Sequence, residues 1–375
     1  KILSETKAVY NILKISYNQI MNILFITDLY PIKDSEKTTP RTLFDFVKEW
    51  KKQGNKVDVL KPNFILNSFI RKKPYYKTGR YNDVYNVNYW TPFWFNVHAK
   101  LQNLPKYDIV IAHMPSGILF ADKLGIPFIA GIHNSDIEVL TKPIYKIHFK
   151  KRLEKALKNA KLIACRSFVL KEKLLKLYPE FEEKIFVAPS GVDEKFIIDA
   201  GDKNLHFPIK VLTCAYFKKR KNIDKVIEAC NGVENIELTV IGDGKERKTL
   251  EKIDKNVKFL GSLPHDKVLE KMRENDIFVL PSVGETFGMV YLEAMASGCI
   301  TVCTKGDGVD GIIKNGENGF LVEPNSNSVK ETLLNIKNMD IKSLNALRNN
   351  SFSTIKNYTS AICAERYLQQ ILKIL

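Results

Sequence analysis

The segment GETFGMVYLEAMASG, residues 284–298, contains two carboxylates in an otherwise uncharged stretch, Glu285 and Glu293. Residues three or four positions apart are neighbours on a helix, so a helix here places Glu293 on an apolar face. A buried carboxylate costs several kcal/mol unless hydrogen-bond donors face it. The hydroxyl pair of a bound ligand is one source of donors, and a nearby lysine or backbone group is the other. The apolar face consists of Met289, Leu292 and Ala296.

The pattern around the two carboxylates predicts a strand, a loop and a helix. Residues 276–282 (DIFVLPS) suit a buried strand, residues 283–288 a loop, and residues 289–297 a helix that the next glycine ends. The start of a helix exposes backbone NH groups, which bind an anion or a sugar hydroxyl. The two glycines of the loop let a ligand approach the main chain closely. The residues expected to line this site are Glu285, Thr286, Phe287, Gly288 and Met289, the last three through their NH groups.

Short apolar runs alternate with amphipathic stretches along most of the chain, beginning with NILFIT (22–27) and the helical TLFDFVKEWKKQG (42–54). Such alternation indicates parallel sheets covered by helices on both faces. A second series opens with IKVLTCAY (209–216). The sequence therefore predicts an α/β chain of two doubly wound domains facing across a cleft, where ligands bind beyond the carboxyl ends of the strands. The expected divisions are an N-terminal extension at 1–20, either native or an appendage, domains at 21–198 and 209–355, and a closing helix at 356–375 that crosses back to the first domain.

Several segments resemble the family-4 retaining glycosyltransferases, which have the two-domain GT-B fold. PSVGETFGMVYLEAMASG (281–298) is similar to the family signature of two glutamates separated by seven residues. The resemblance covers roughly residues 21–375 and is strongest in 209–325. The other segments that carry it are TVIGDGKERKTL (239–250), LPHDKVLEKMRENDIFVLPS (263–282), GDGVDGIIKNGENGFLVEP (306–324), GIHNSDIE (131–138) and APSGVDEKF (188–196).

The resemblance implies roles for the charged residues of the second domain. Glu293 would accept hydrogen bonds from the ribose hydroxyls of a nucleotide, and Glu285 would meet hydroxyls of the donor sugar. Lys221, in the basic run YFKKRKN (216–222), matches the family lysine that holds the donor diphosphate. Such a charge-assisted bond is strong and also stabilises the charge that grows on the departing diphosphate. A solvated charge cluster is the alternative for this run. The resemblance implies no metal and no cofactor.

Two departures from the family pattern concern phosphates and acceptor. Many relatives carry an arginine five or six residues before the lysine, where Tyr216 and Ala215 stand here. Arg220 or Lys218 is expected to take its place. After LYP, the usual paired glycines give way to IKDSEKTTPRT (32–42), so the acceptor specificity of the family cannot be carried over.

Histidines near the expected strand ends are further candidates. His133, in GIHNSDIE, follows a buried-looking strand and is expected at the cleft edge. The family resemblance implies a catalytic histidine here, beside the donor sugar and the reacting carbon; a histidine hydrogen-bonded in the core is the alternative. Asp136 is expected either to contact the acceptor or to cap the next helix. His113, in VIAHMPSG, is another acceptor candidate at the cleft. His265 lies in a turn, away from these strand ends, and is expected to cap or pack.

The net charge of +16 is typical of proteins that meet nucleic acid, an anionic membrane or a phosphorylated substrate. Residues 141–161 carry eight Lys or Arg and one Glu, with an apolar stripe opposite the lysines. Such a helix lies either on an anionic bilayer or against its own domain. Nucleic acid is not expected, because no zinc-finger ligand spacing or RNA-binding aromatic signature is present. The stripe consists of Phe149, Leu153, Ala156, Leu157 and Ala160.

The cysteine pattern and the hydropathy suggest a location. Six cysteines are scattered without a Cys-x-x-Cys pair, and we expect them to be core residues of a protein in a reducing cytoplasm. No stretch approaches 18 consecutive apolar residues, so a membrane-spanning helix is not expected.

The family resemblance, which these features fit, implies a metal-independent, retaining glycosyltransferase of the hexosyltransferase type. It would move a sugar from a nucleotide-diphosphate donor to a saccharide or lipid-linked acceptor in cell-surface polysaccharide synthesis, in the cytoplasm or on the inner face of the membrane. Two alternatives stay open. A nucleotide-sugar epimerase of similar shape would convert the donor without an acceptor, and a basic non-catalytic protein would bind polyanions or membranes.

Overall fold

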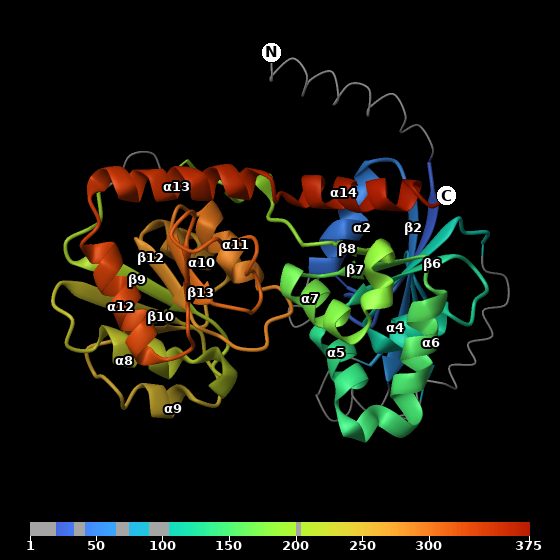
Figure 1. The fold of residues 1–375 in the computed structure, drawn as a ribbon, viewed down its shortest axis with the longest axis horizontal. Helices are drawn as coiled ribbons and strands as arrows, with labels where there is room; N and C mark the ends of the chain where they lie inside the picture. Colours follow the sequence, from blue (N-terminus) through green and yellow to red (C-terminus); the bar gives the residue numbers. More distant parts are fainter. Residues whose placement is uncertain (1–19, 34–41, 65–74, 90–104, 200–203) are drawn as a thin grey trace, which may run out of the picture.

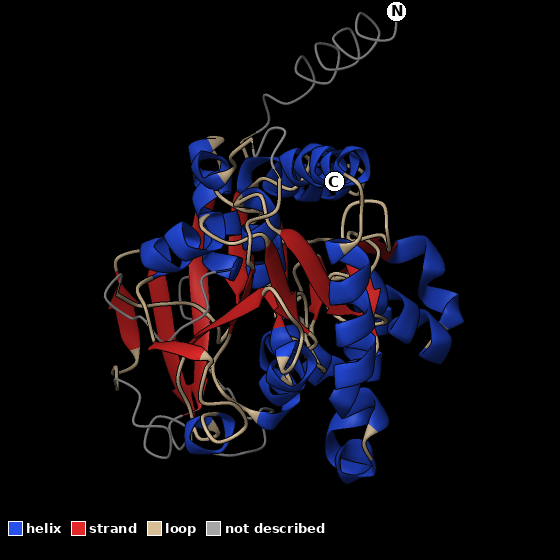
Figure 2. Cartoon of the chain, turned by 90° about the vertical axis from the view of Figure 1, so that its left-hand side faces the viewer, coloured by secondary structure: helices blue, strands red, loops and turns tan. Residues whose placement is uncertain are grey.

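The computed structural model describes residues 20–33, 42–64, 75–89, 105–199 and 204–375. Nearly all of the expected extension at 1–20 and most of the loop at 32–42 lie outside these residues. The described chain forms two α/β halves that lie side by side (Figure 1). Figure 2 shows the molecule from the side of the second half, with the strands of the sheets lying between layers of helices.

The first half is built on an eight-stranded sheet in the order β3-β4-β2-β1-β5-β6-β7-β8. Neighbouring strands are parallel except for the antiparallel pair β3 and β4. On β1, Leu24 packs into one buried cluster and Phe25 into another, because successive side chains point to opposite faces. The strands are β1 (Asn22–Ile26), β2 (Lys56–Phe64), β3 (Gly79–Tyr81), β4 (Val84–Tyr89), β5 (Ile109–His113), β6 (Phe128–Ile132), β7 (Leu162–Cys165) and β8 (Ile185–Val187).

Helices cover both faces of this sheet, as the apolar strands predicted. The α-helices of the first half are α2 (Thr42–Lys52), α4 (Met114–Ala121), α5 (Asn134–Thr141), α6 (Lys151–Asn159) and α7 (Phe168–Leu177). Short helical turns are η2 (Pro143–Tyr145), η3 (Lys146–Lys150), η4 (Pro179–Lys184) and η5 (Glu194–Phe196). On α6 the predicted apolar stripe is buried in the domain's own core: Leu153, Ala156 and Leu157 are 0% exposed. The bilayer interpretation of this stripe is therefore wrong.

The second half is built on a six-stranded parallel sheet in the order β11-β10-β9-β12-β13-β14. The strand order reverses between β9 and β12, which opens a crevice beyond their carboxyl ends. The strands are β9 (Ile209–Cys214), β10 (Ile236–Ile241), β11 (Lys258–Gly261), β12 (Ile277–Leu280), β13 (Ile300–Thr304) and β14 (Phe320–Val322). The helices are η6 (Lys219–Lys221), α8 (Ile223–Cys230), α9 (Arg247–Leu250), α10 (His265–Arg273), α11 (Met289–Ala296), α12 (Ser326–Lys337) and α13 (Ile341–Lys356).

The chain passes between the halves twice, first between β8 and β9 and then between α13 and α14 (Ser360–Leu372), and we call these two segments the crossings. After α13 it returns to the first half as α14, which packs on α2 (Figure 1). There the indole NH of Trp50 donates to the carbonyl of Ala364 at 2.9 Å. The two crossings are joined by backbone hydrogen bonds, from Val192 N to Tyr358 O at 2.9 Å and from Ser360 N to Val192 O at 2.8 Å.

The expected fold class is confirmed: the chain is an α/β protein with two doubly wound sheets, both parallel apart from the β3–β4 pair. All six cysteines are free thiols, and Cys299 and Cys303 are 1% exposed in the core, as expected. No helix in the described ranges is long and apolar enough to span a membrane.

Candidate functional site

The reversal of strand order in the second sheet brings two loops together. The loop after β9 contains the basic run 216–222, and the loop after β12 contains Glu285. Backbone and side-chain bonds join them: Val283 N donates to Arg220 O at 2.8 Å, and the amide of Asn222 donates to Pro281 O at 2.7 Å. Residues 65 positions apart therefore share one edge of the sheet.

Glu285 is the centre of this cluster. Its Oε1 accepts from Lys221 Nζ at 2.6 Å, from Arg220 Nη1 at 2.9 Å and from Ser282 Oγ at 2.6 Å. Burial acts to raise the pKa of Glu285, but Lys221, Ser282 and Arg220 outweigh it and hold the pKa below its usual value. The carboxylate is therefore ionised at neutral pH. Among the described residues, its Oε2 accepts no hydrogen bond.

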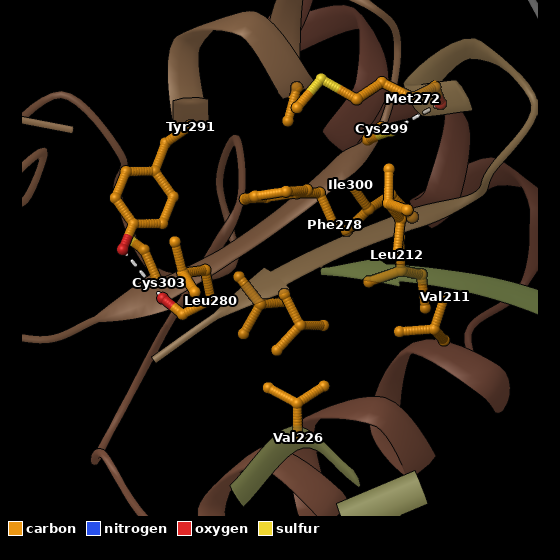
Figure 3. Packing of buried hydrophobic residues seen from close by; sticks show 14 of the residues in the cluster. Val211, Leu212, Val226, Met272, Phe278, Leu280, Tyr291, Cys299, Ile300 and Cys303 are labelled. Carbon is orange, nitrogen blue, oxygen red and sulfur yellow. Dashed lines mark hydrogen bonds between the residues drawn. The ribbon is translucent and has the colours of Figure 1, made fainter. Parts of the chain in front are cut away.

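The start of α11 borders the same cluster. Tyr291 is 2% exposed and donates through its hydroxyl to Leu280 O at 2.8 Å, which ties the helix to the end of β12 (Figure 3). Gly288 has φ +97°, and a Cβ there would lie 2.5 Å from the Tyr291 ring. Within the described chain, no acceptor faces the backbone NH groups of Phe287, Gly288 and Met289. These donors can meet an anion or a hydroxyl group.

Glu293 lies further along α11 and lines a cavity of about 1080 Å³ between the two halves. Its Oε1 is 2.9 Å from His265 Nε2, and its side chain is 18% exposed. The hydrogen bond to Glu293 is the main cause that raises the pKa of His265 above its ordinary value. The cavity is lined by residues of α2, the two crossings, the loop after β11 and α11, among them Asp45, Lys48, Phe196, Pro264, His265, Met289 and Glu293.

His265 was expected to cap or pack away from the site, and the structure corrects this. It begins α10, and the Phe196 ring packs against its ring at a centroid distance of 5.6 Å. It follows β11, whose carboxyl end lies at the same edge of the parallel sheet as those of β9 and β12. That placement is the signal that would have identified it from sequence.

The acceptor candidates of the first half are buried. His113 is 0% exposed, and its Nδ1 lies 3.0 Å from Nε2 of His133. Asp136 is also 0% exposed and accepts from the backbone NH of His133 at 2.8 Å, so it caps α5. Burial lowers the pKa of His113 well below its usual value and raises that of Asp136 well above it. Both side chains are thus buried in this structure, and Asp136 takes the capping role that the sequence offered as its alternative.

His133 takes the alternative of a histidine hydrogen-bonded in the core. It is 7% exposed, and burial and then the Arg166 guanidinium lower its pKa to about 3, so the ring is neutral. Arg166 is itself buried and donates to Ala188 O at 2.6 Å and to Ser190 Oγ.

Of the remaining site residues predicted from the sequence, some reach Glu285 and others do not. Lys221 and Arg220 reach Glu285, whereas Lys218 is exposed, with its ammonium 5.2 Å from the centre of the Tyr216 ring. Thr286 lies in the loop and is half-buried. Sequence reasoning did not identify Ser282 or Asp307, whose carboxylate accepts from the backbone of the Glu285 loop. No group of three or more His, Cys, Asp and Glu side chains in the described ranges could hold a metal ion.

Comparisons with known proteins identify the family of each half. Residues 39–196 match the family model Glycosyltransferase Family 4, and residues 199–353 match Glycosyl transferases group 1. An uncharacterized glycosyltransferase of Methanocaldococcus jannaschii is 32% identical over 228 residues, which are 59% of this chain and 62% of that protein. A protein of Bacillus subtilis named as a teichuronic acid biosynthesis glycosyltransferase, TuaC, is 26% identical over 346 residues, 82% of this chain and 86% of that protein.

Solved structures share the fold. Sucrose-phosphate synthase of Thermosynechococcus elongatus has a TM-score of 0.70 at 16% identity, covering 94% of this chain and 99% of that one. HepE of Anabaena, solved with UDP-glucose, has a TM-score of 0.68 at 18% identity, covering 94% and 100%. These likenesses show the GT-B fold. The chain therefore belongs to the glycosyltransferases, with a Glycosyltransferase Family 4 domain at residues 39–196 followed by a Glycosyl transferases group 1 domain at residues 199–353.

Proposed function

We propose that this protein transfers a sugar from a nucleoside-diphosphate donor to a saccharide or lipid-linked acceptor, with retention at the anomeric carbon. The observation that carries the proposal is the Glu285 cluster at the switch point of the second sheet. There two cations, one ionised carboxylate and the start of α11 converge. Cations and helix NH groups suit a diphosphate, and a carboxylate with an open oxygen suits a sugar hydroxyl.

The donor would lie along this edge from cluster to cavity. Lys221 and Arg220 would turn from Glu285 to the diphosphate, and Oε2 of Glu285 would accept from the sugar. Glu293 would accept from the ribose hydroxyls inside the cavity, and His265 would keep a hydrogen bond to its other oxygen. HepE of Anabaena, which shares the fold, was solved with UDP-glucose, and this supports a nucleotide sugar as the ligand.

In the transfer step the bond from the anomeric carbon to the diphosphate oxygen breaks, and a bond to the acceptor oxygen forms on the same face. The departing phosphate oxygen accepts the proton of the acceptor hydroxyl. Lys221, Arg220 and the NH groups at the start of α11 would stabilise the charge that develops on the diphosphate. His133, neutral and hydrogen-bonded to His113, would support the cleft wall, and we assign no proton transfer to it.

Binding of nucleoside diphosphates tests this proposal. We expect UDP, GDP or ADP to raise the melting temperature, because a ligand that binds only the folded state stabilises it. Lys221→Met should abolish the shift, whereas Lys219→Met, its exposed neighbour, should not. A protein that none of the three nucleotides stabilises would contradict the proposal. Conversion of a donor sugar without an acceptor would favour the epimerase.

A membrane-bound acceptor would also explain the basic outer face of α6. With the apolar stripe buried, α6 exposes basic side chains, among them Lys151, Lys155 and Lys158, and Ile144 in the preceding turn η2 is 81% exposed. Lys150, just before α6, is half-buried and lies 3.8 Å from Glu154. We propose that these lysines meet an anionic bilayer by electrostatic attraction. Replacing Lys150, Lys151, Lys155 and Lys158 by Ala should reduce sedimentation with phosphatidylglycerol vesicles. The matched set Lys245, Lys248, Lys252 and Lys255 should leave it unchanged, and equal losses would contradict a specific surface.

A further inference from the structure

The two peptide groups that flank Gly284 are held from opposite sides. The NH of Gly284 donates to Oδ2 of Asp307, in the loop after β13. The carbonyl of Gly284 accepts from Nδ2 of Asn134, the first residue of α5, at 3.0 Å. Arg220 Nη1 lies 3.4 Å from the same carbonyl oxygen. Since peptide groups are planar, fixing both of them also fixes the Cα of the next residue, Glu285.

Asp307 joins two loops of the second half. It is 7% exposed, and its Oδ1 accepts from Gly308 N at 2.8 Å while Oδ2 takes Gly284 N. The loops are in close contact, because a Cβ on Gly308 would lie 2.7 Å from Phe287 O and 3.1 Å from the Glu285 Cβ. Hydrogen bonds from backbone NH groups to a carboxylate are stronger than neutral ones. Asp307 therefore holds the Glu285 loop from within its own domain.

Asn134 belongs to the other half of the molecule. α5 and α7 lie on the side of the first half that faces the second half (Figure 1). A second contact across this boundary accompanies that of Asn134: a Cβ on Gly311 would lie 2.9 Å from the Phe168 side chain, at the start of α7. Gly311 is in the same loop as Asp307. The first half thus touches the Glu285 loop directly and the Asp307 loop beside it.

We propose that Asp307 and Asn134 are positioning residues, which hold the Gly284 peptides so that Glu285 is set in place where the two halves meet. The inference rests on the proposed function, since it takes Glu285 to contact the donor sugar. Neither residue would touch the donor. Asp307 would act in any arrangement of the halves, whereas Asn134 would act only when they are in contact and so would couple domain closure to the position of Glu285.

Two isosteric variants separate these contacts. Asp307→Asn keeps the shape but loses the charge and turns one acceptor into a donor that faces an NH group. Asn134→Asp replaces the donor to Gly284 O by an acceptor, while an acid in the first turn of α5 favours the helix dipole and keeps α5 folded. Asp310→Asn is the matched control, because Asp310 lies in the same loop but accepts from Gly306 N at 2.6 Å instead.

The experiment combines hydrogen exchange with kinetics on the full chain. In the donor-free protein we expect the amide of Gly284, which donates to Asp307, to exchange about tenfold faster in Asp307→Asn, as for the loss of one charged hydrogen bond. With UDP-glucose as donor, both variants should lower kcat about tenfold with KM changed less than about threefold, because Glu285 acts in the transition state. Affinity for UDP, which lacks the sugar, should stay the same, and Asp310→Asn should match the wild type in every measurement.

The outcomes are distinguishable. Unchanged exchange in Asp307→Asn would overturn the clamp whatever the donor. If the Gly284 amide exchanges faster in Asp307→Asn but kcat is unchanged in an active protein, Asp307 does not position Glu285. If a variant loses affinity for UDP and for UDP-glucose equally, its effect is merely structural and the positioning role is overturned. A wild-type protein that binds none of UDP, GDP and ADP would count against the proposed function, while the exchange rates would still decide whether Asp307 holds the loop.

Discussion

Glu293 carries a charge on a helix whose neighbouring side chains are apolar. Leu292 and Ala296 are fully buried, but Glu293 reaches the cavity between the halves and is hydrogen-bonded to His265. If Glu293 had only a structural role, we would expect a hydrogen-bond donor to each of its two carboxylate oxygens. Here the described residues supply a donor to Oε1 alone, which leaves Oε2 for a ligand inside the cavity.

Glu293→Gln should weaken donor use by about 1.5–3 kcal/mol, the usual worth of a hydrogen bond to a charged group. The amide keeps the size of the side chain, so folding should be preserved. The measurement is kcat/KM for the donor, together with the melting temperature. Glu270→Gln, on the exposed face of α10, is the control and should have no effect. Unchanged kcat/KM in a folded Glu293→Gln protein would contradict the ribose contact.

The pair of His265 and Glu293 makes stability depend on pH. The pKa of His265 is raised above its ordinary value of 6.5 in the folded protein, chiefly by the hydrogen bond to Glu293. A raised folded pKa means that the pair stabilises the protein fully below about pH 6.5 and loses this effect as pH rises through the folded pKa. The melting temperature of wild type minus that of His265→Asn should therefore be largest near about pH 5.5 and vanish at alkaline pH. A difference that is constant with pH, or that persists in a Glu293→Gln background, would contradict this.

Part of the site could be predicted from the types and positions of residues in the sequence. Glu285, Lys221 and Arg220 could be grouped from sequence, because loops after parallel strands share one edge of the sheet. The end of β11 could have placed His265 at the same edge, but its hydrogen bond with Glu293, 28 residues away, could not be predicted, since the contact depends on how α10 and α11 pack. His113 illustrates the opposite error. A strand end at the correct edge suggested exposure, but the ring turns into the core toward His133.

At the scale of elements, the start of α11 depends on one backbone conformation. Gly288 adopts φ +97° and lies against the Tyr291 ring. Gly288→Ala should cost about 1–2 kcal/mol for the left-handed conformation and about 1–3 kcal/mol more for displacing the ring. Gly54→Ala is the matched control, because Gly54 has φ +93° with nothing within 4 Å. Urea denaturation measures both, and equal losses of stability would show that the ring contact contributes nothing.

The apolar runs predicted element types well, because strands buried on both faces need continuous apolar sequence. β1, β9, β12 and α11 all occur where the sequence placed them. Strand order was not predictable from these runs: pairing of β9 with β12 joins segments separated by more than 60 residues. The stripe of α6 shows the same limit. Its periodicity predicted an apolar face correctly, but only packing decides that the face covers the sheet rather than a bilayer.

At the scale of the whole molecule, the proposed function requires the two halves to face each other across the cavity. The two crossings determine how the halves are joined. Gly191 makes their close contact possible. A Cβ there would lie 2.2 Å from the carbonyl carbon and oxygen of Thr359 and 2.4 Å from Ser360 N, all backbone atoms that cannot rotate away. The bridge beside it consists of the two backbone hydrogen bonds made by Val192.

Gly191→Ala should therefore separate the crossings and break the bridge at Val192. Two lost hydrogen bonds of about 0.5–1.5 kcal/mol each would lower the free energy of unfolding by about 1–3 kcal/mol. Hydrogen exchange should accelerate at the amides of Val192 and Ser360, while those of β9 and β12 stay protected because neither sheet is touched. Ser360→Ala is the control: it removes only the hydroxyl bond to Gly191 O, at 3.0 Å, and should leave both amides protected. Protected amides in a folded Gly191→Ala protein would mean that the crossings tolerate the added methyl group, and the closeness of their contact would then not determine how the halves are joined.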